Sequence, residues 1–183
     1  MSIRKPLSKT STILFNEHKN ILKVIKSLEK ECENIEKGKD IDKTFFREAI
    51  EFIRNYADRF HHAKEEDILF KEFNKKVEQE PGCAHCNPVE QMLIEHDEGR
   101  AFVKAMEQAV EKEDKNNVIE NARGYAALLQ EHIFKEDNIL YPMTDDALDE
   151  KTKEQMLEKF NKIQDERKDE EKKYIQFVRG LKE

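Results

Sequence analysis

Apolar residues recur along the chain at intervals of three and four positions, the spacing that places them on one face of an α-helix. Such stripes cover residues 11–33 and 42–77. A third stripe follows Asn87 and Pro88, which predict a helix start, and runs to about residue 111. A fourth follows and reaches Tyr141, where Pro142 is expected to stop the helix. Four amphipathic helices joined by short links predict an all-α, up-down four-helix bundle.

A thinner pattern follows this bundle. Its apolar positions are interrupted by an almost entirely charged run at 164–173. We therefore expect one or two accessory amphipathic helices packed on the outside of the bundle. The predicted organisation is a four-helix domain at 1–148 and an accessory segment at 149–183. Binding of a partner by this segment is the less favoured alternative. The apolar positions are Leu157, Phe160, Ile163, Phe177, Val178 and Leu181.

Composition narrows the class of protein. The chain has 183 residues, 40% of them charged and 37% apolar, with only five Gly and four Pro, so turn-rich β sandwiches and barrels are disfavoured. A net charge of −7 without a basic stripe argues against nucleic acid. No run of about 18 apolar residues suggests a membrane span, and residues 1–10 do not resemble a signal peptide. Three cysteines favour a reducing compartment, so we expect a cytoplasmic protein.

Four of the six histidines interrupt the apolar stripes where a core residue was due, one on each helix. A single core imidazole is more often hydrogen-bonded than metal-bound. Burying four together costs several kcal/mol unless something satisfies them, which divalent metal ions do. These histidines are His18, His61, His96 and His132.

Two glutamates strengthen the case for a metal. Glu65 follows His61 and Glu136 follows His132, each by four residues, so each pair shares one helix face. The two segments, 61–70 and 132–141, align without gaps as an internal repeat. A mixed nitrogen and oxygen set suits iron, manganese or zinc rather than calcium. Two octahedral ions have about twelve positions, of which about one would stay open for a small ligand.

Other charged residues of the repeat have plainer interpretations. Glu66 and Asp137 are expected to be ordinary surface acids. Lys64 and Lys135 are expected to lie along the bundle surface with solvated ammonium groups.

Several linked motifs resemble the hemerythrin-like, HHE cation-binding domains. They are Asn16-Glu17-His18 with Ile21, the segment 61–70, Glu95-His96-Asp97-Glu98-Gly99-Arg100, and the segment 132–142, in the family's order. The resemblance spans about Ser11 to Met143, and the tail after Asp149 resembles the extra helices of stand-alone members. It implies a left-handed four-helix bundle holding a non-haem, oxo- or carboxylate-bridged di-iron centre. The implied ligands are His18, His61, Glu65, His96, His132 and Glu136.

One departure concerns the third helix. Oxygen-carrying hemerythrins place two metal histidines one turn apart there, whereas His96 is followed at this spacing by Arg100. We expect His62 to supply the missing ligand, with a water, Glu17 or Glu95 as alternatives. Arg100 could reach Glu65 or Glu136, or form a solvent-facing ion pair. Tyr125 is expected to pack in the core rather than bond a ligand.

The remaining candidate chemistry lies at Cys83-Ala84-His85-Cys86. A lone CxxC has no second pair of ligands for zinc, so loop thiols without metal are favoured over a disulfide switch or an intersubunit site. Cys32 is expected to be a small helix residue.

The sequence and the resemblance together favour a cytoplasmic protein with two non-haem iron ions (Fe2+/Fe3+) and a bridging oxygen, with zinc or manganese as substitutes. It would bind dioxygen, nitric oxide or peroxide. The rival hypotheses are a di-iron enzyme that reduces peroxide or nitric oxide or repairs iron-sulfur clusters, a redox-sensing regulatory module, and a zinc-stabilised bundle. No nucleic acid or membrane partner is expected; a homodimer, or a protein partner at the C-terminal helix, stays open.

Overall fold

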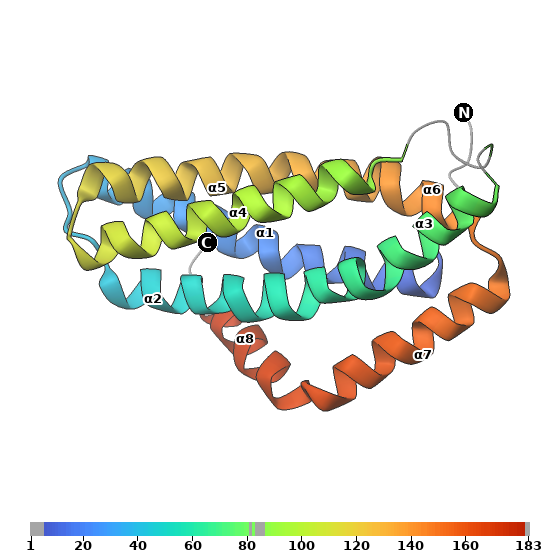
Figure 1. The fold of residues 1–183 in the computed structure, drawn as a ribbon. Coiled ribbons are helices and arrows are strands. Elements are labelled where there is room, and N and C mark those ends of the chain that lie inside the picture. Colours follow the sequence, from blue (N-terminus) through green and yellow to red (C-terminus); the bar gives the residue numbers. More distant parts are fainter. Residues whose placement is uncertain (1–5, 81, 83–86, 182–183) are drawn as a thin grey trace.

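Helices account for nearly all of the described chain in the computed structural model, which describes residues 6–80, 82 and 87–181. Within these residues no strand occurs, as the all-α prediction requires. Four rods lie side by side in Figure 1 and form the bundle. The first rod is α1 (Lys9–Glu36) and the third is α4 (Val89–Glu111). The second rod joins α2 (Lys43–Phe52), η1 (Ile53–His62), η2 (Glu65–Leu69) and α3 (Phe70–Gln79), and the fourth joins α5 (Lys115–Lys135), η3 (Glu136–Leu140) and α6 (Tyr141–Ala147).

Side-chain caps fix where the helices begin. Ser8, Asp42, Asp114 and Asp149 each accept a hydrogen bond from a backbone N–H three residues later. Asn87 accepts from the backbone N–H of Val89 at 3.1 Å, although α4 begins at Val89 with Pro88 at the N-cap, one residue later than predicted. The helix boundaries therefore follow from local polar residues, which satisfy N–H groups that have no partner within the helix.

Pro142 does not end the fourth rod, so that prediction was wrong. The chain stays helical to Ala147. Pro142 is the second residue of α6, directly after the π-helical segment η3. The change from π-helical to α-helical hydrogen bonding falls just before Pro142, and a helix tolerates a residue without an N–H where its hydrogen-bonding pattern changes.

The π-helical segments η2 and η3 occupy the same positions in the two copies of the internal repeat. Segment η2 starts at Glu65 and η3 starts at Glu136, the two glutamates that the sequence selects as metal ligands. A π-helical turn widens the backbone and changes the direction of the side chains that follow it. The two copies of the repeat therefore match in backbone geometry as well as in sequence.

Two apolar clusters fill the bundle, and the polar layer with the core histidines lies between them. Along α1, His18 stands between Leu14 of one cluster and Ile21 of the other. Along α4, His96 stands between Met92 and Val103 in the same way. The clusters close the layer off from both ends of the bundle, so the layer is both buried and polar.

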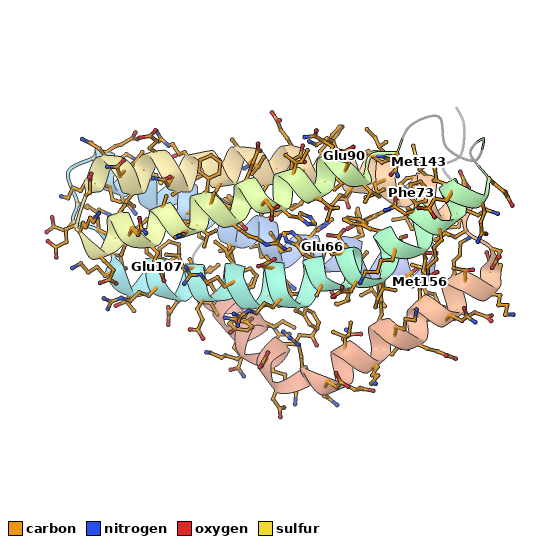
Figure 2. All side chains as sticks on the ribbon, in the orientation of Figure 1. Glu66, Phe73, Glu90, Glu107, Met143 and Met156 are labelled. Atoms are coloured by element: carbon orange, nitrogen blue, oxygen red, sulfur yellow. The ribbon has the colours of Figure 1, made fainter. Side chains whose placement is uncertain are left out.

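The C-terminal segment packs on the bundle through two further helices, α7 (Glu150–Glu166) and α8 (Lys168–Gly180). Figure 1 shows them meeting at an angle beside the second rod. Met156 of α7 joins the cluster that contains Phe73 of α3, and both are labelled in Figure 2. Tyr174 and Val178 of α8 join the other cluster. None of the helices described here is long and apolar enough to cross a membrane.

Candidate metal centre

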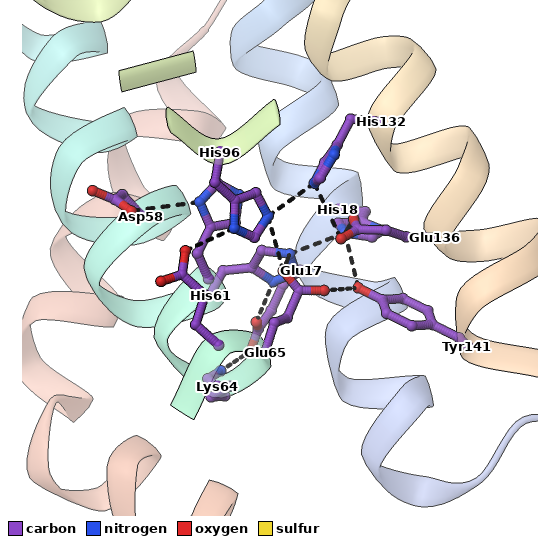
Figure 3. Close-up of polar contacts among 12 residues, drawn as sticks. Glu17, His18, Asp58, His61, Lys64, Glu65, His96, His132, Glu136 and Tyr141 are labelled. Atoms are coloured by element: carbon purple, nitrogen blue, oxygen red, sulfur yellow. Dashed lines mark hydrogen bonds and ion pairs between the residues drawn. The ribbon is translucent and has the colours of Figure 1, made fainter. Parts of the chain in front are cut away.

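The four core histidines meet in one layer as two pairs (Figure 3). Nε2 of His18 lies 3.0 Å from Nε2 of His61, and Nε2 of His96 lies 3.0 Å from Nε2 of His132. Every one of these side chains is buried. The inward orientation predicted from the apolar stripes is confirmed.

A carboxylate holds the other nitrogen of each ring. Because a carboxylate only accepts hydrogen bonds, each Nδ1 carries a proton, and in a neutral ring the Nε2 atom presents a lone pair. Two lone pairs facing each other at 3.0 Å repel unless a cation or proton lies between them. Metal-bound histidines typically make this Nδ1 contact. The Nδ1 partners are Asp137 for His18 (2.8 Å), Glu17 for His61 (2.9 Å), Glu66 for His96 (2.7 Å) and Glu95 for His132 (2.8 Å).

These contacts correct the expectation for Glu66 and Asp137. Both were expected to be ordinary surface acids, but each is partly buried and orients a core histidine. The reason lies in the repeat: each acid directly follows a buried glutamate, so it sits at the edge of the polar layer and reaches the histidine of a neighbouring rod. Glu17 and Glu95, weighed as alternative ligands, instead contact Nδ1 of His61 and His132.

Glu65 and Glu136 lie at the centre of the layer and are fully buried. Glu136 places Oε2 at 3.2 Å from Nε2 of His18 and Oε1 at 3.1 Å from Nε2 of His132, so it faces both pairs. Oε2 of Glu65 lies 3.7 Å from Nε2 of His61 and 3.6 Å from Nε2 of His96. Although these histidine nitrogens lie nearby, Oε2 of Glu65 and both oxygens of Glu136 form no hydrogen bond of suitable geometry with the described residues.

His62 extends the set of nitrogen donors. Its ring is buried and stacks on His96, with centroids 3.7 Å apart and planes 12° apart. Its Nδ1 lies 3.5 Å from Asp58 and has no hydrogen-bond partner within the described chain. Donor atoms of His62, Glu65, His96 and His132 all lie within 4.8 Å of one another, and so do those of His18, His61 and Glu136. The structure thus brings together all seven residues that the sequence proposes as ligands.

Electrostatics show why this cluster fits cations. Burial, reinforced by Glu136, raises the pKa of Glu65 well above its usual range. Burial acts in the same direction on Glu136, but His132 and His18 outweigh it and hold its pKa well below the usual range. Burial and then the neighbouring His96 lower the pKa of His62 to about 4, which keeps that ring neutral. The two central carboxylates ionise together only if further positive charge lies beside them, and divalent ions supply it.

Lys64 corrects another expectation, because it is completely buried rather than solvated. Its ammonium group donates to Glu17 and lies 3.5 Å from the centroid of the Phe60 ring. Lys135 donates to Glu95 in the equivalent way, but its side chain is 33% exposed. A signal for this arrangement was present in the sequence, since a Glu-His dipeptide precedes each His-x-x-Lys segment.

Arg100 forms ion pairs at the edge of the layer with Asp58, Glu66 and Asp97. This is the solvent-facing alternative, since its donors serve these acids rather than Glu65 or Glu136. Glu66 also accepts from Nδ1 of His96, so Arg100 supports that histidine through a shared acid.

A cavity of about 190 Å³ has His62, His96, Gly99 and Tyr125 among its lining residues. A Cβ atom at Gly99 would meet the Tyr125 ring at 3.6 Å. Core packing of Tyr125 is confirmed, because the ring belongs to the apolar cluster.

The cysteine predictions have different outcomes. Cys32 is buried in α1 as a small core residue, which confirms its expected role. The predictions for Cys83, His85 and Cys86 lie outside the described residues.

Comparison with known protein families matches residues 10–144 to the hemerythrin HHE cation-binding domain. The match covers most of the 183 residues, including nearly all of the four rods and every residue of the two donor groups. No curated protein and no solved structure gives a significant match. The family match, together with the all-α bundle and the buried donor groups, shows that this chain belongs to the hemerythrin family of cation-binding domains and is a metal-binding protein.

Proposed function

We propose that this protein holds two non-haem iron ions in the polar layer and binds dioxygen, or a related diatomic molecule or peroxide, at an open coordination position. The observation that carries the proposal is the convergence of two donor groups: paired Nε2 atoms 3.0 Å apart, with carboxylate oxygens that lack hydrogen-bond partners among the described residues. A single ion would use one pair and leave the other unsatisfied. Two ions satisfy both.

The ligand sets follow from the two donor groups. One ion would take His18, His61 and an oxygen of Glu136. The second would take His62, Glu65, His96 and His132. Because Glu136 also approaches His132, its second oxygen would join the two ions. The first ion has fewer protein donors, so the open position is assigned to it.

The choice of iron rests on the donor chemistry. Imidazole together with carboxylate suits iron, and zinc or manganese could substitute. Iron when bound supplies the redox chemistry and the affinity for diatomic ligands that zinc lacks. The protein supplies the rest: Nδ1 contacts that fix the rings, buried carboxylates that balance charge, and apolar clusters that exclude water. In a reducing compartment such as the cytoplasm, expected from the cysteine content, cellular reductants would return oxidised iron to iron(II).

Metal analysis with an electronic spectrum under air tests the proposal. We expect two irons per chain and oxo-to-iron charge-transfer bands in the near ultraviolet. His132→Ala should lose bound iron, whereas His85→Ala, which changes the one histidine outside the proposed ligand set, should keep it. Zinc alone with no bands would refute the redox role, and equal iron in both variants would refute the ligand set. Turnover with peroxide or nitric oxide would favour an enzyme over a carrier.

A further inference from the structure

The cavity of about 190 Å³ beside the polar layer is larger than a diatomic ligand requires. A protein cavity of about 150 Å³ with apolar walls can hold a benzene molecule. The lining residues come from η1, α4 and α5, so three of the rods contribute to one space. Most of the wall is apolar or aromatic. The residues that form this part are Ile53, Ala57, Gly99, Val103, Tyr125 and Leu129.

Gly99 keeps part of this space open. It lies inside α4, where glycine is less favourable than alanine. A Cβ atom at Gly99 would approach the Tyr125 ring at 3.6 Å, an ordinary contact, whereas at Gly124 it would lie 2.5 Å from the Phe102 ring. Packing therefore requires glycine at position 124 but not at position 99. The missing methyl group of Gly99 provides volume in the cavity instead.

Tyr125 brings a polar group to the cavity wall. Its side chain is 3% exposed, and its hydroxyl group forms no hydrogen bond with the described residues. Burial, with the negative charge of Asp58, raises the pKa of this phenol well above its usual value, so the hydroxyl keeps its proton. A buried hydroxyl donor without an acceptor is unfavourable. An oxygen atom of a ligand in the cavity would be its acceptor.

The exposed side of the cavity carries an unpaired positive charge on Arg59. This arginine donates only to the side-chain oxygen of Asn55, at 3.4 Å, and pairs with no carboxylate of the described chain. The other lining charges are already paired: the arginines with acids, and the acids Asp58 and Glu95 with cations. The cavity therefore combines an apolar wall, a hydrogen-bond donor and a positive charge.

We infer that this cavity is a binding site for a small aromatic carboxylate of about the size of benzoate. The aromatic ring lies against the apolar wall, in the space that Gly99 leaves. The carboxylate accepts a hydrogen bond from the Tyr125 hydroxyl and is attracted by Arg59. The inference does not rest on the proposed function, because side chains alone form the cavity and no metal ion takes part in binding.

Calorimetric titration of the full chain with benzoate tests this inference, with iron-loaded and with chelator-treated protein. We expect one saturable site per chain in both forms, with a dissociation constant of about 1 mM or lower. Benzamide has the same shape without the charge and should bind about threefold more weakly. Absence of saturable benzoate binding up to about 10 mM would overturn the inference. Binding to the iron-loaded form alone would identify iron as the site and overturn it too.

Substitutions locate the ligand. Gly99→Ala places a methyl group in the cavity and should raise the benzoate dissociation constant about tenfold. Its Tm should stay the same or rise, since alanine suits a helix better. Gly180→Ala is the matched control, because a Cβ atom added there, in α8, meets nothing within 4 Å and should leave benzoate affinity unchanged. Equal affinities in these two variants, or a clearly lower Tm of Gly99→Ala, would overturn the inference.

Two further variants test the polar contacts. Tyr125→Phe keeps the ring and removes the hydroxyl, so benzoate should bind about tenfold more weakly. Arg59→Gln should abolish the preference for benzoate over benzamide, because it removes the charge that separates these probes. Wild-type protein that binds benzoate and benzamide equally would contradict the carboxylate assignment, and unchanged benzoate affinity in Tyr125→Phe would contradict the role of its hydroxyl.

Discussion

Glu17 accepts a hydrogen bond from the ammonium group of Lys64, and both side chains are buried beneath the bundle surface. The same carboxylate accepts from Nδ1 of His61 at 2.9 Å. Burial raises the pKa of Glu17 to about 7 and lowers that of Lys64, each shift moderated by the charge of the other. The contact makes them a buried pair, and the same carboxylate orients a proposed metal ligand.

Removing the charge of Lys64 should destabilise the protein strongly. Lys64→Met keeps the apolar stem but leaves Glu17 buried without its cation. Breaking a buried pair in this way costs about 3–5 kcal/mol of unfolding free energy. Urea denaturation of the metal-free protein measures this loss.

Lys135→Met is the matched control that the internal repeat provides. Its carboxylate partner Glu95 is equally buried, but the lysine side chain is 33% exposed and solvent screens the pair. The expected loss is below about 1 kcal/mol. Equal losses in the two variants would show that burial of Lys64 contributes nothing.

Much of the fold and the site follows from the sequence. Apolar residues at helical spacing predict the four rods, and histidines at inward positions on those rods are expected to meet in their common core. That argument places His18, His61, His96 and His132 together without any resemblance, because a helix fixes the direction of each side chain from its position. The spacing of Glu65 and Glu136 adds both acids for the same reason.

Other features depend on contacts between rods, which spacing along one helix does not encode. Lys64 was expected in solvent, but an acid on another rod and the neighbouring helices bury it. Glu66 and Asp137 were expected to be ordinary surface acids because their positions face the edge of a rod, where the partner histidine belongs to a different rod. The sequence predicts a helix end at Pro142 because the π-helical segment before it leaves no mark in the apolar pattern.

His62→Gly tests whether His62 is a ligand. We expect both irons to stay, since six of the seven proposed ligands remain, with an altered spectrum from the lost nitrogen donor. Added imidazole should restore the wild-type spectrum, because the space of the removed side chain adjoins a cavity of about 190 Å³. Absorption titration with imidazole measures the rescue. If neither the substitution nor imidazole changed the spectrum, His62 would not be a ligand.

Acid should destabilise the metal-free protein through His61 and His62. Burial, with nearby positive charge on other histidines, lowers the pKa of His61 well below its usual value and that of His62 to about 4. An unfolded histidine takes up its proton near pH 6.5. Between about pH 6.5 and 4 the unfolded state therefore binds more protons, so stability falls as the pH falls.

Alkali should destabilise it through His18 and His132. Burial opposes their charge, but carboxylate contacts prevail, with Asp137 first for His18 and Glu136 first for His132, and raise both pKa values to about 9. Between about pH 6.5 and 9 the native state binds more protons, so stability falls as the pH rises.

These histidine shifts alone give most stability near pH 6.5, and the raised pKa values of Glu65 and Glu17, which keep protons on the native state above pH 4.5, move the Tm maximum of the metal-free protein toward lower pH. Iron should remove the alkaline loss, because the ions take the place of the protons between the paired Nε2 atoms. Thermal unfolding followed by circular dichroism, with and without chelator from pH 4 to 9, measures both effects. A Tm of the metal-free protein that climbs steadily to pH 9 would contradict the assigned protonation of the pairs.

Phe160 should be the main apolar anchor of the C-terminal segment. It is fully buried in the cluster that α7 shares with α3 and α6, so Phe160→Ala should cost about 3–5 kcal/mol. Phe134 on α5 is 63% exposed, and the same truncation there should change stability by less than about 0.5 kcal/mol. Urea denaturation compares the two, and limited proteolysis should cut residues 149–183 faster in the Phe160 variant alone. Similar proteolysis of both variants would mean that other contacts hold α7 on the bundle.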